Sequence, residues 1–95
     1  MKWKLIMKRT EVIAEIGWNH MGDMILAKEM VSAAADAGAD YAKFQTWSVS
    51  RLKSGPWDDD GRRDIYKKAE LTEKIHYELM EECKVNKVDF LTSIF

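Results

Sequence analysis

Glu11-Val-Ile-Ala-Glu-Ile-Gly-Trp-Asn-His-Met-Gly-Asp23 is the stretch of sequence that decides the fold. Its first half, Val12 to Ile16, is apolar except for Glu15, a pattern typical of a parallel strand covered on both faces. A polar turn follows, and Asp23 is a good helix N-cap because its carboxylate can accept from a free backbone amide. The stretch predicts a strand, a turn and a helix, with the turn at the end of the strand where α/β proteins bind ligands.

Strand and helix patterns alternate along the rest of the chain. In order, we predict a strand over residues 12–16, a helix over 24–37, a strand over 41–46, a helix over 73–85 and a strand over 88–95. Residues 1–10 are expected to be a lead-in segment, and residues 47–64 a long loop with a helical turn over 65–69. The predicted fold class is α/β, with residues 11–95 forming the N-terminal portion (β-α-β-α-β) of a TIM (β/α)8 barrel. A barrel is favoured over an open sheet because both crossovers lie on one side and no glycine-rich nucleotide turn is present.

The two long helices also carry signals for their buried faces and their ends. The buried face of the first is predicted to hold Leu26, Met30, Ala33, Ala34 and Ala37. Thr72 is the expected N-cap of the second helix, and Asn86 is expected to take the left-handed conformation that ends it. Cys83 lies on the apolar stripe of that helix and is interpreted as a packing residue, not a nucleophile.

Composition limits the class of protein. The 95 residues allow one domain at most, and the apolar and charged fractions of 46% and 33% are those of a soluble globular chain. A net charge of −1 argues neither for nor against any class of partner, but no basic stripe stands out, so no nucleic-acid partner is predicted. No apolar run approaches the ~20 residues of a membrane span, and no targeting segment is recognised. The single cysteine fits a reducing, cytoplasmic setting.

Three polar side chains interrupt the predicted strands. Glu15 either points into a polar barrel interior or reflects a structural ion pair or an edge strand, and its spacing leaves these alternatives open. Lys43 and Gln45 share one face of their strand, and an inward lysine is a natural anchor for a carboxylate or a phosphate. If Glu15 and Lys43 both face inward, they could neutralise each other and bracket a polar ligand. The alternative is a buried salt bridge with no ligand.

Weaker signals lie in the turns. His20 is interpreted as a solvated loop residue, because a metal role would need further ligands and only His76, on a helix, is available. Thr92 and Ser93 offer hydroxyls where a phosphate could bind. The acidic run 58–60 either holds a cation or is a solvated loop. A solvated acidic loop is the favoured interpretation, and the two histidines predict no metal site.

Three segments together resemble one family. Residues 13–23 contain Glu-Ile-Gly-Trp-Asn-His-Met-Gly-Asp, residues 37–46 read Ala-Gly-Ala-Asp-Tyr-Ala-Lys-Phe-Gln-Thr, and residues 90–95 read Phe-Leu-Thr-Ser-Ile-Phe. Each is similar to a motif of the sialic acid synthases, which comprise N-acetylneuraminate synthase and its legionaminate and pseudaminate relatives. The resemblance spans residues 11–95, nearly the whole chain.

The resemblance implies a barrel enzyme that condenses phosphoenolpyruvate with an N-acylated aminosugar of the N-acetylmannosamine type. The products would be a nonulosonic acid, for surface carbohydrate biosynthesis, and phosphate. It also implies a divalent metal, Mn2+ or Mg2+, whose ligands are absent from this chain, and a homodimer when the enzyme is complete. The isolated chain is accordingly expected to be inactive.

By position, the resemblance gives roles to four residues. Lys43 matches a lysine that binds phosphoenolpyruvate, and Gln45 matches a residue near the acceptor sugar. Glu15 matches an active-site glutamate that handles a proton or positions water. Ser93 stands where the family has a threonine that hydrogen-bonds phosphoenolpyruvate.

Asn19 and His20 also match the family signature and are taken as substrate-binding positions whose individual roles stay open. Ile94 replaces the family's proline, and Thr92-Ser93 inverts its Ser-Thr order, which puts the phosphate contact there in question. Two other interpretations remain: a different aldolase or phosphoenolpyruvate-condensing barrel, or a truncated fragment without catalysis.

Overall fold

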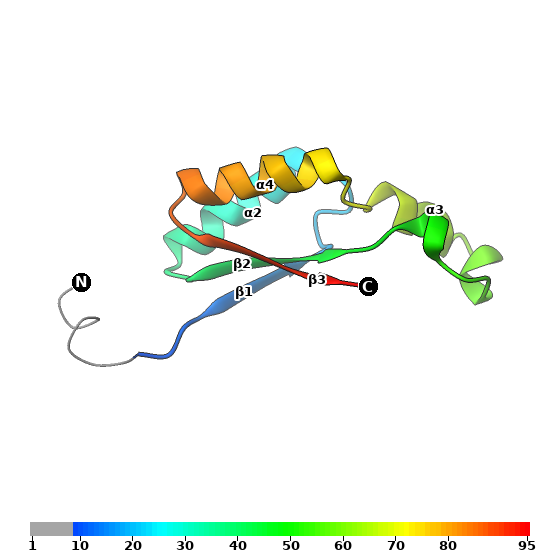
Figure 1. The fold of residues 1–95 in the computed structure, drawn as a ribbon, viewed down its shortest axis with the longest axis horizontal. Helices are drawn as coiled ribbons and strands as arrows, with labels where there is room; N and C mark the ends of the chain where they lie inside the picture. Colours follow the sequence, from blue (N-terminus) through cyan, green and yellow to red (C-terminus); the bar gives the residue numbers. More distant parts are fainter. Residues whose placement is uncertain (1–8) are drawn as a thin grey trace.

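The computed structural model describes residues 9–95, so positions 1–8 of the predicted lead-in segment lie outside the described residues (Figure 1). Three strands, β1 (Ile13–Gly17), β2 (Tyr41–Thr46) and β3 (Asp89–Ile94), form a parallel sheet in the order β1-β2-β3. Helix α2 (Met24–Asp36) connects the first two strands, and helix α4 (Glu73–Val85) leads into the third. The predicted β-α-β-α-β order is confirmed.

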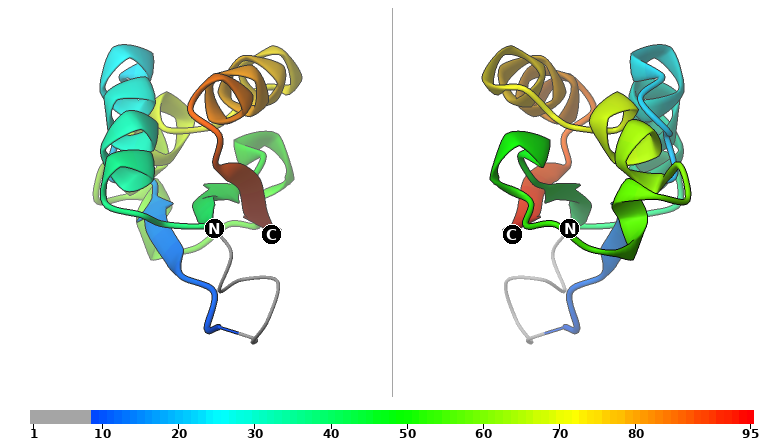
Figure 2. Two further views of the ribbon diagram at one scale, coloured as in Figure 1. Left: turned by 90° about the vertical axis from the view of Figure 1, so that its left-hand side faces the viewer. Right: turned by 90° about the vertical axis from the view of Figure 1, so that its right-hand side faces the viewer.

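Both long helices lie on the same side of the sheet. The end-on views show α2 and α4 packed above the strands, with no helix of residues 9–95 beneath them (Figure 2). The core between the two layers contains Val31, Phe44, Leu79 and Cys83, all buried, and the Phe44 ring stacks on Phe90 with centroids 5.7 Å apart. The other sheet face is bare in the described structure, as the sequence predicts. No helix among these residues is long and apolar enough to cross a membrane.

Side-chain caps begin both long helices. Asp23 Oδ1 accepts a hydrogen bond from the Leu26 amide at 3.1 Å, and Thr72 Oγ1 accepts one from the Ile75 amide at 3.2 Å. Each cap satisfies one of the amides that a helix start leaves without an intrahelical partner. Both predicted N-caps are confirmed.

The predicted buried face of α2 is correct at Ala34, which is buried, and at Met30, which packs against the core, but it misses Ala27 and Val31. Ala27, Val31 and Ala34 face the core, whereas Ala33 and Ala37 are exposed. Successive residues of a helix differ by about 100° in direction, so a phase error of one residue moves the stripe to the flank. The predicted stripe is centred on the large side chains of Leu26 and Met30. In the structure the small Ala27 faces the core, and its size lets α2 lie close to the sheet.

The end of α4 also differs from the prediction. Asn86 has φ −87°, outside the left-handed region, and Lys87 has the positive φ of 59°. The Asn86 side-chain amide instead donates to the Glu82 carbonyl at 2.8 Å. This bond satisfies a free carbonyl of the last turn, which keeps Asn86 near helical geometry and moves the reversal one residue later.

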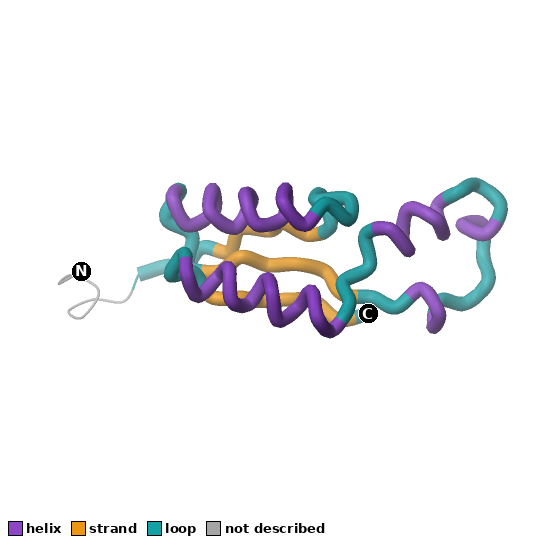
Figure 3. Tube along the Cα trace, turned by 90° about the horizontal axis from the view of Figure 1, so that it is seen from above, coloured by secondary structure: helices purple, strands orange, loops and turns teal. Residues whose placement is uncertain are grey.

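The connection between β2 and α4, residues 47–72, contains more structure than the predicted loop. It holds two short 3-10 helices, η1 (Val49–Arg51) and η2 (Pro56–Asp58), and helix α3 (Arg62–Lys68), which begins before the predicted turn over 65–69. Seen from above, this β2–α4 connection projects beyond the carboxyl ends of the strands (Figure 3).

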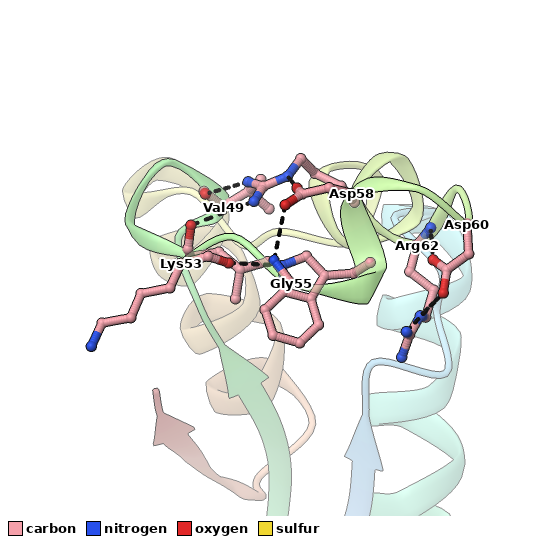
Figure 4. Close-up of polar contacts among 9 residues, drawn as sticks. Val49, Lys53, Gly55, Asp58, Asp60 and Arg62 are labelled. Carbon is pink, nitrogen blue, oxygen red and sulfur yellow. Dashed lines mark hydrogen bonds and ion pairs between the residues drawn. The ribbon is translucent and has the colours of Figure 1, made fainter.

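Hydrogen bonds within the β2–α4 connection hold its shape. The Arg63 guanidinium pairs with Asp58 and donates to the Val49 carbonyl at 3.2 Å. Asp58 Oδ2 also accepts from the Gly55 amide at 2.9 Å, and Trp57 Nε1 donates to the Lys53 carbonyl at 2.9 Å (Figure 4). The β2–α4 connection is therefore a folded substructure, held by hydrogen bonds between residues up to 21 positions apart, such as that from the Val49 amide to Glu70 Oε1 at 2.7 Å.

Candidate functional site

Glu15 and Lys43 lie beside each other on the bare face of the sheet. They are register partners on β1 and β2, and Lys43 Nζ is 3.3 Å from Glu15 Oε1. The two side chains remain 48% and 29% exposed, respectively. The expected ion pair is present, but it is not the buried salt bridge of the alternative interpretation. Its charges are open to a ligand.

Gln45 and Ser93 form the next row toward the carboxyl ends of the strands. They are register partners on β2 and β3, on the same face as Lys43 because strand side chains alternate. We call Glu15, Lys43, Gln45 and Ser93 the polar patch. The structure thus brings together the four residues to which the family resemblance gives individual roles.

Gly17 shapes the edge of this patch. Its φ is +60°, and the β1–β2 register shifts between Glu15 and Gly17. A Cβ at this position would lie 3.5 Å from Gln45 Nε2 and 3.8 Å from Glu15 Oε2. Glycine therefore allows the chain to leave the strand in a left-handed turn and leaves the space between these two side chains open.

His20 is not part of the polar patch. Its side chain is fully buried, and its ring lies 6.1 Å from that of Phe44, on the helix side of the sheet. Nδ1 accepts a hydrogen bond from the Gly22 amide at 3.0 Å, and burial lowers the pKa of the ring. The prediction of a solvated loop histidine is wrong, because the turn folds back over the core and the imidazole packs into it.

Asn19 also supports the turn. Its side-chain amide donates to the Ile16 carbonyl at 2.8 Å, and its backbone amide bonds the same oxygen at 3.2 Å. Short polar side chains commonly stabilise turns by bonding nearby backbone in this way. In the described structure, Asn19 and His20 build the loop that follows β1.

A chain of hydrogen bonds on the helix side links β2, β3 and α4. Thr92 Oγ1 lies 2.7 Å from Thr46 Oγ1, which lies 2.8 Å from His76 Nε2, and His76 Nδ1 lies 2.7 Å from the Thr72 carbonyl. A carbonyl only accepts, so Nδ1 donates to Thr72 and, in a neutral ring, Nε2 accepts from Thr46. The Thr92 hydroxyl therefore points away from the polar patch, which leaves Ser93 as the phosphate candidate of the pair.

Three aromatic rings from separate segments meet at the carboxyl end of β2. Trp18, Trp47 and Tyr66 lie edge to face, with ring centroids 5.8, 6.0 and 6.1 Å apart. Trp47 Nε1 donates to the Tyr66 carbonyl at 2.9 Å, which ties α3 to the end of the strand. We call these three residues the aromatic trio. No motif in the sequence predicts this cluster, although a tryptophan follows each of the first two strands.

The aromatic trio lines a pocket of about 360 Å³ next to the polar patch. The remaining lining residues are Gln45, Ser48, Leu52 and Phe95. None of the seven side chains carries a charge. The carboxyl ends of the strands therefore present a charged surface and, beside it, an uncharged and mostly apolar hollow.

The acidic run of the β2–α4 connection is bonded to arginines. Asp58 pairs with Arg63 and Asp60 with Arg62, and these side-chain hydrogen bonds lower the pKa of both carboxyl groups. Across residues 9–95, no group of three or more His, Cys, Asp or Glu side chains is placed to hold a metal ion. The residues described do not fit the divalent metal that the family resemblance implies.

Comparison with known proteins identifies the family. The NeuB family matches residues 30–95 of the sequence. The chain belongs to the NeuB family. The predicted resemblance to the sialic acid synthases and their legionaminate and pseudaminate relatives is thereby confirmed.

Several NeuB-family relatives are synthases by name. The chain is 37% identical over 100 residues to the N,N'-diacetyllegionaminic acid synthase of Campylobacter jejuni, covering 94% of this chain and 30% of that protein. It is 34% identical over 82 residues to the pseudaminic acid synthase of Helicobacter pylori, covering 75% of this chain and 24% of that one.

A solved NeuB-family structure has the same arrangement. The crystal structure of the N-acetylneuraminic acid (sialic acid) synthetase of Leptospira borgpetersenii, in complex with citrate, superposes with a TM-score of 0.76 at 33% identity. The match covers 88% of this chain and 28% of the synthetase. The chain therefore spans less than a third of the length of these relatives.

Proposed function

We propose that this NeuB-family chain is the first part of an enzyme that condenses phosphoenolpyruvate with an N-acylated aminosugar. The products would be a nonulosonic acid for surface carbohydrate biosynthesis and inorganic phosphate. The observation that carries the proposal is the open ion pair of Glu15 and Lys43 beside Gln45 and Ser93. The names of the three relatives described above, synthases of N,N'-diacetyllegionaminic acid and pseudaminic acid and a synthetase of N-acetylneuraminic acid, support it.

The proposed architecture is a (β/α)8 barrel whose interior is lined by the bare face of the sheet. Parallel strands with helices on one face are what a segment of such a barrel looks like, and active sites lie at the carboxyl ends of its strands. Gln45 and Ser93 of the polar patch lie near that end of β2 and β3, which supports the proposal. We further propose that the complete enzyme is cytoplasmic and homodimeric.

Lys43 is the proposed anchor for phosphoenolpyruvate. Its ammonium group lies on an open face, where it can donate to a carboxylate or phosphate oxygen while Glu15 stays within 3.3 Å. Glu15 neutralises the lysine until the substrate arrives, and the bound anion takes over that role. The Ser93 hydroxyl, one row further on β3, is placed to donate to the same ligand.

Glu15 then becomes available for proton handling. In the proposed reaction, C3 of phosphoenolpyruvate forms a bond to the aldehyde carbon of the sugar, whose oxygen takes up a proton and becomes a hydroxyl. Water adds to the cationic C2, and the C–O bond to phosphate then breaks, which leaves a ketone and inorganic phosphate. A carboxylate released from its ion pair can orient that water and accept its proton. Gln45 is the proposed contact for the acceptor sugar. We assign no step to the implied metal, and its ligands are proposed to lie outside these 95 residues.

A chimeric enzyme tests this function. Residues 11–95 would replace the matching segment of the Campylobacter legionaminic acid synthase, and phosphate release would be measured with phosphoenolpyruvate and the aminosugar substrate of that enzyme. We expect turnover, and a loss of roughly a hundredfold in kcat/KM for phosphoenolpyruvate in Lys43→Ala. Lys74→Ala, which removes an exposed lysine of α4, is the matched control and should have no effect.

The proposal fails if a chimera with the native circular dichroism spectrum shows no turnover. It also fails in its central step if Lys43→Ala leaves kcat/KM unchanged. The 95-residue chain alone should release no phosphate, because its described residues hold no metal site.

A further inference from the structure

The pocket beside the polar patch has the size and composition of a small-molecule subsite. Its volume of about 360 Å³ lies within the ~300–1,000 Å³ of typical ligand pockets. Its apolar walls are the aromatic trio, Leu52 and Phe95, and its polar side chains are Gln45 and Ser48. Apolar walls with a few convergent polar groups are the usual construction of such sites.

Packing alone does not account for this arrangement. Edge-to-face contacts and the Trp47–Tyr66 hydrogen bond hold the three rings at fixed angles, yet a cavity remains between them and Gln45. Trp18 comes from the β1 turn and is only half-buried. The side-chain amide of Gln45 forms no hydrogen bond to any other residue of the segment 9–95, so its donor and acceptor are available.

The polar patch and the pocket differ in charge, and therefore in the groups that they can recognise. The ion pair of Glu15 and Lys43 suits an anion, whereas an uncharged aromatic pocket suits a neutral group with an apolar end. An N-acyl substituent is such a group, because it joins an amide, which needs hydrogen bonds, to a methyl or longer alkyl. Gln45 at the pocket wall can bond the amide while the rings enclose the alkyl.

We propose that Trp18, Trp47 and Tyr66 form the subsite for the N-acyl group of the acceptor aminosugar, with Gln45 bonding the amide. This inference rests on the proposed function and adds a specificity determinant to it. Trp18 comes from the β1 turn and Tyr66 from α3, and their rings are in contact. The β2–α4 connection would therefore contribute one wall of the acceptor site through α3.

Saturation-transfer NMR on the 95-residue chain with N-acetylmannosamine as the probe tests the subsite directly. Irradiating the protein should saturate the acetyl methyl protons more strongly than the ring protons of the sugar. Mannose, which lacks the N-acyl group, should bind at least fourfold more weakly, the equivalent of the ~0.8 kcal/mol of one buried methyl or methylene group. N-propanoylmannosamine should bind more tightly than the acetyl sugar by a similar factor.

Three variants distinguish the pocket from the rest of the β2–α4 connection. Trp18→Ala removes one wall of the pocket and should weaken binding of N-acetylmannosamine roughly tenfold, with Trp18→Phe restoring most of it. Trp57→Ala removes another indole, one that bonds Lys53 and does not line the pocket, and should have no effect. Circular dichroism would establish that each variant keeps its helices.

Equal binding of mannose and N-acetylmannosamine would overturn the inference, as would no binding of either sugar. Uniform saturation of the sugar protons in the wild-type chain would do the same without reference to any variant. Failure of the proposed function is seen separately, in phosphate release by the chimera and its dependence on Lys43. A chimera that turns over while Trp18→Ala leaves its KM for the sugar unchanged retains the function and refutes only the subsite.

Discussion

Breaking the ion pair of Glu15 and Lys43 is expected to cost little stability. The charged atoms are 3.3 Å apart, but the side chains are 48% and 29% exposed, so water screens the attraction. Half-exposed pairs of this kind contribute about 0–1 kcal/mol, whereas removing one partner of a buried pair costs about 3–5 kcal/mol. We therefore expect a coupling energy of at most about 1 kcal/mol from a double-mutant cycle of Glu15→Gln and Lys43→Met.

Urea denaturation of the four proteins in the cycle, followed by circular dichroism, measures this coupling. It should shrink further in 1 M salt, where the Debye length falls to about 3 Å. A coupling near 3 kcal/mol that persists at high salt would show that the pair is a structural element of the fold. The reasoning that assigns it to anion binding would then be refuted.

Three further predictions concern the loops and the core. Gly22→Ala should lower the free energy of unfolding by more than about 2 kcal/mol, because the new Cβ would lie 2.1 Å from the Lys68 carbonyl oxygen. Gly38 also has a positive φ, but no atom lies within 4 Å of a Cβ there, so Gly38→Ala should cost only about 1 kcal/mol in the same urea titration. Burial lowers the pKa of His20 from 6.5, so on acidification the histidine is protonated more readily in the unfolded chain than in the folded one. The wild type should therefore lose stability relative to His20→Gln as the pH falls below about 6.5. Parallel curves of unfolding free energy against pH for the two proteins would contradict this. Burial raises the pKa of Cys83 to about 11, so iodoacetamide at pH 8 should label the native chain far more slowly than the urea-unfolded one, and equal rates would show an accessible thiol.

Features that depend on local chemistry could be predicted from the sequence. Asp23 and Thr72 cap helices through bonds to amides three residues away, so the nearby sequence contains all the information needed. The shared face of Lys43 and Gln45 follows from the alternation of side chains along one strand. The strand order follows from the rule that β-α-β units pair neighbouring parallel strands.

Features that depend on contacts between distant segments could not be predicted in this way. The aromatic trio joins the β1 turn, the end of β2 and α3, and no spacing along the chain indicates that they meet. The burial of His20 has the same origin, since it depends on how the turn packs against Phe44. The β2–α4 connection is organised by Arg63, which donates to the carbonyl of Val49, 14 residues earlier. Local sequence does not indicate such a contact, and the glycines, proline and aspartates of this connection predict only a loop.

The core fixes the geometry of the proposed site through β2. Along this strand, Ala42 and Phe44 are fully buried beneath the helices, while Lys43 and Gln45 face the bare side. A slip of one residue would turn Phe44 to the bare face and place the Lys43 ammonium in the core, where an unpaired charge is very costly. The packing that stabilises the sheet therefore also holds Lys43 opposite Glu15. Substitutions of the polar patch leave this packing unchanged, which is why they should remove ligand binding without unfolding the chain.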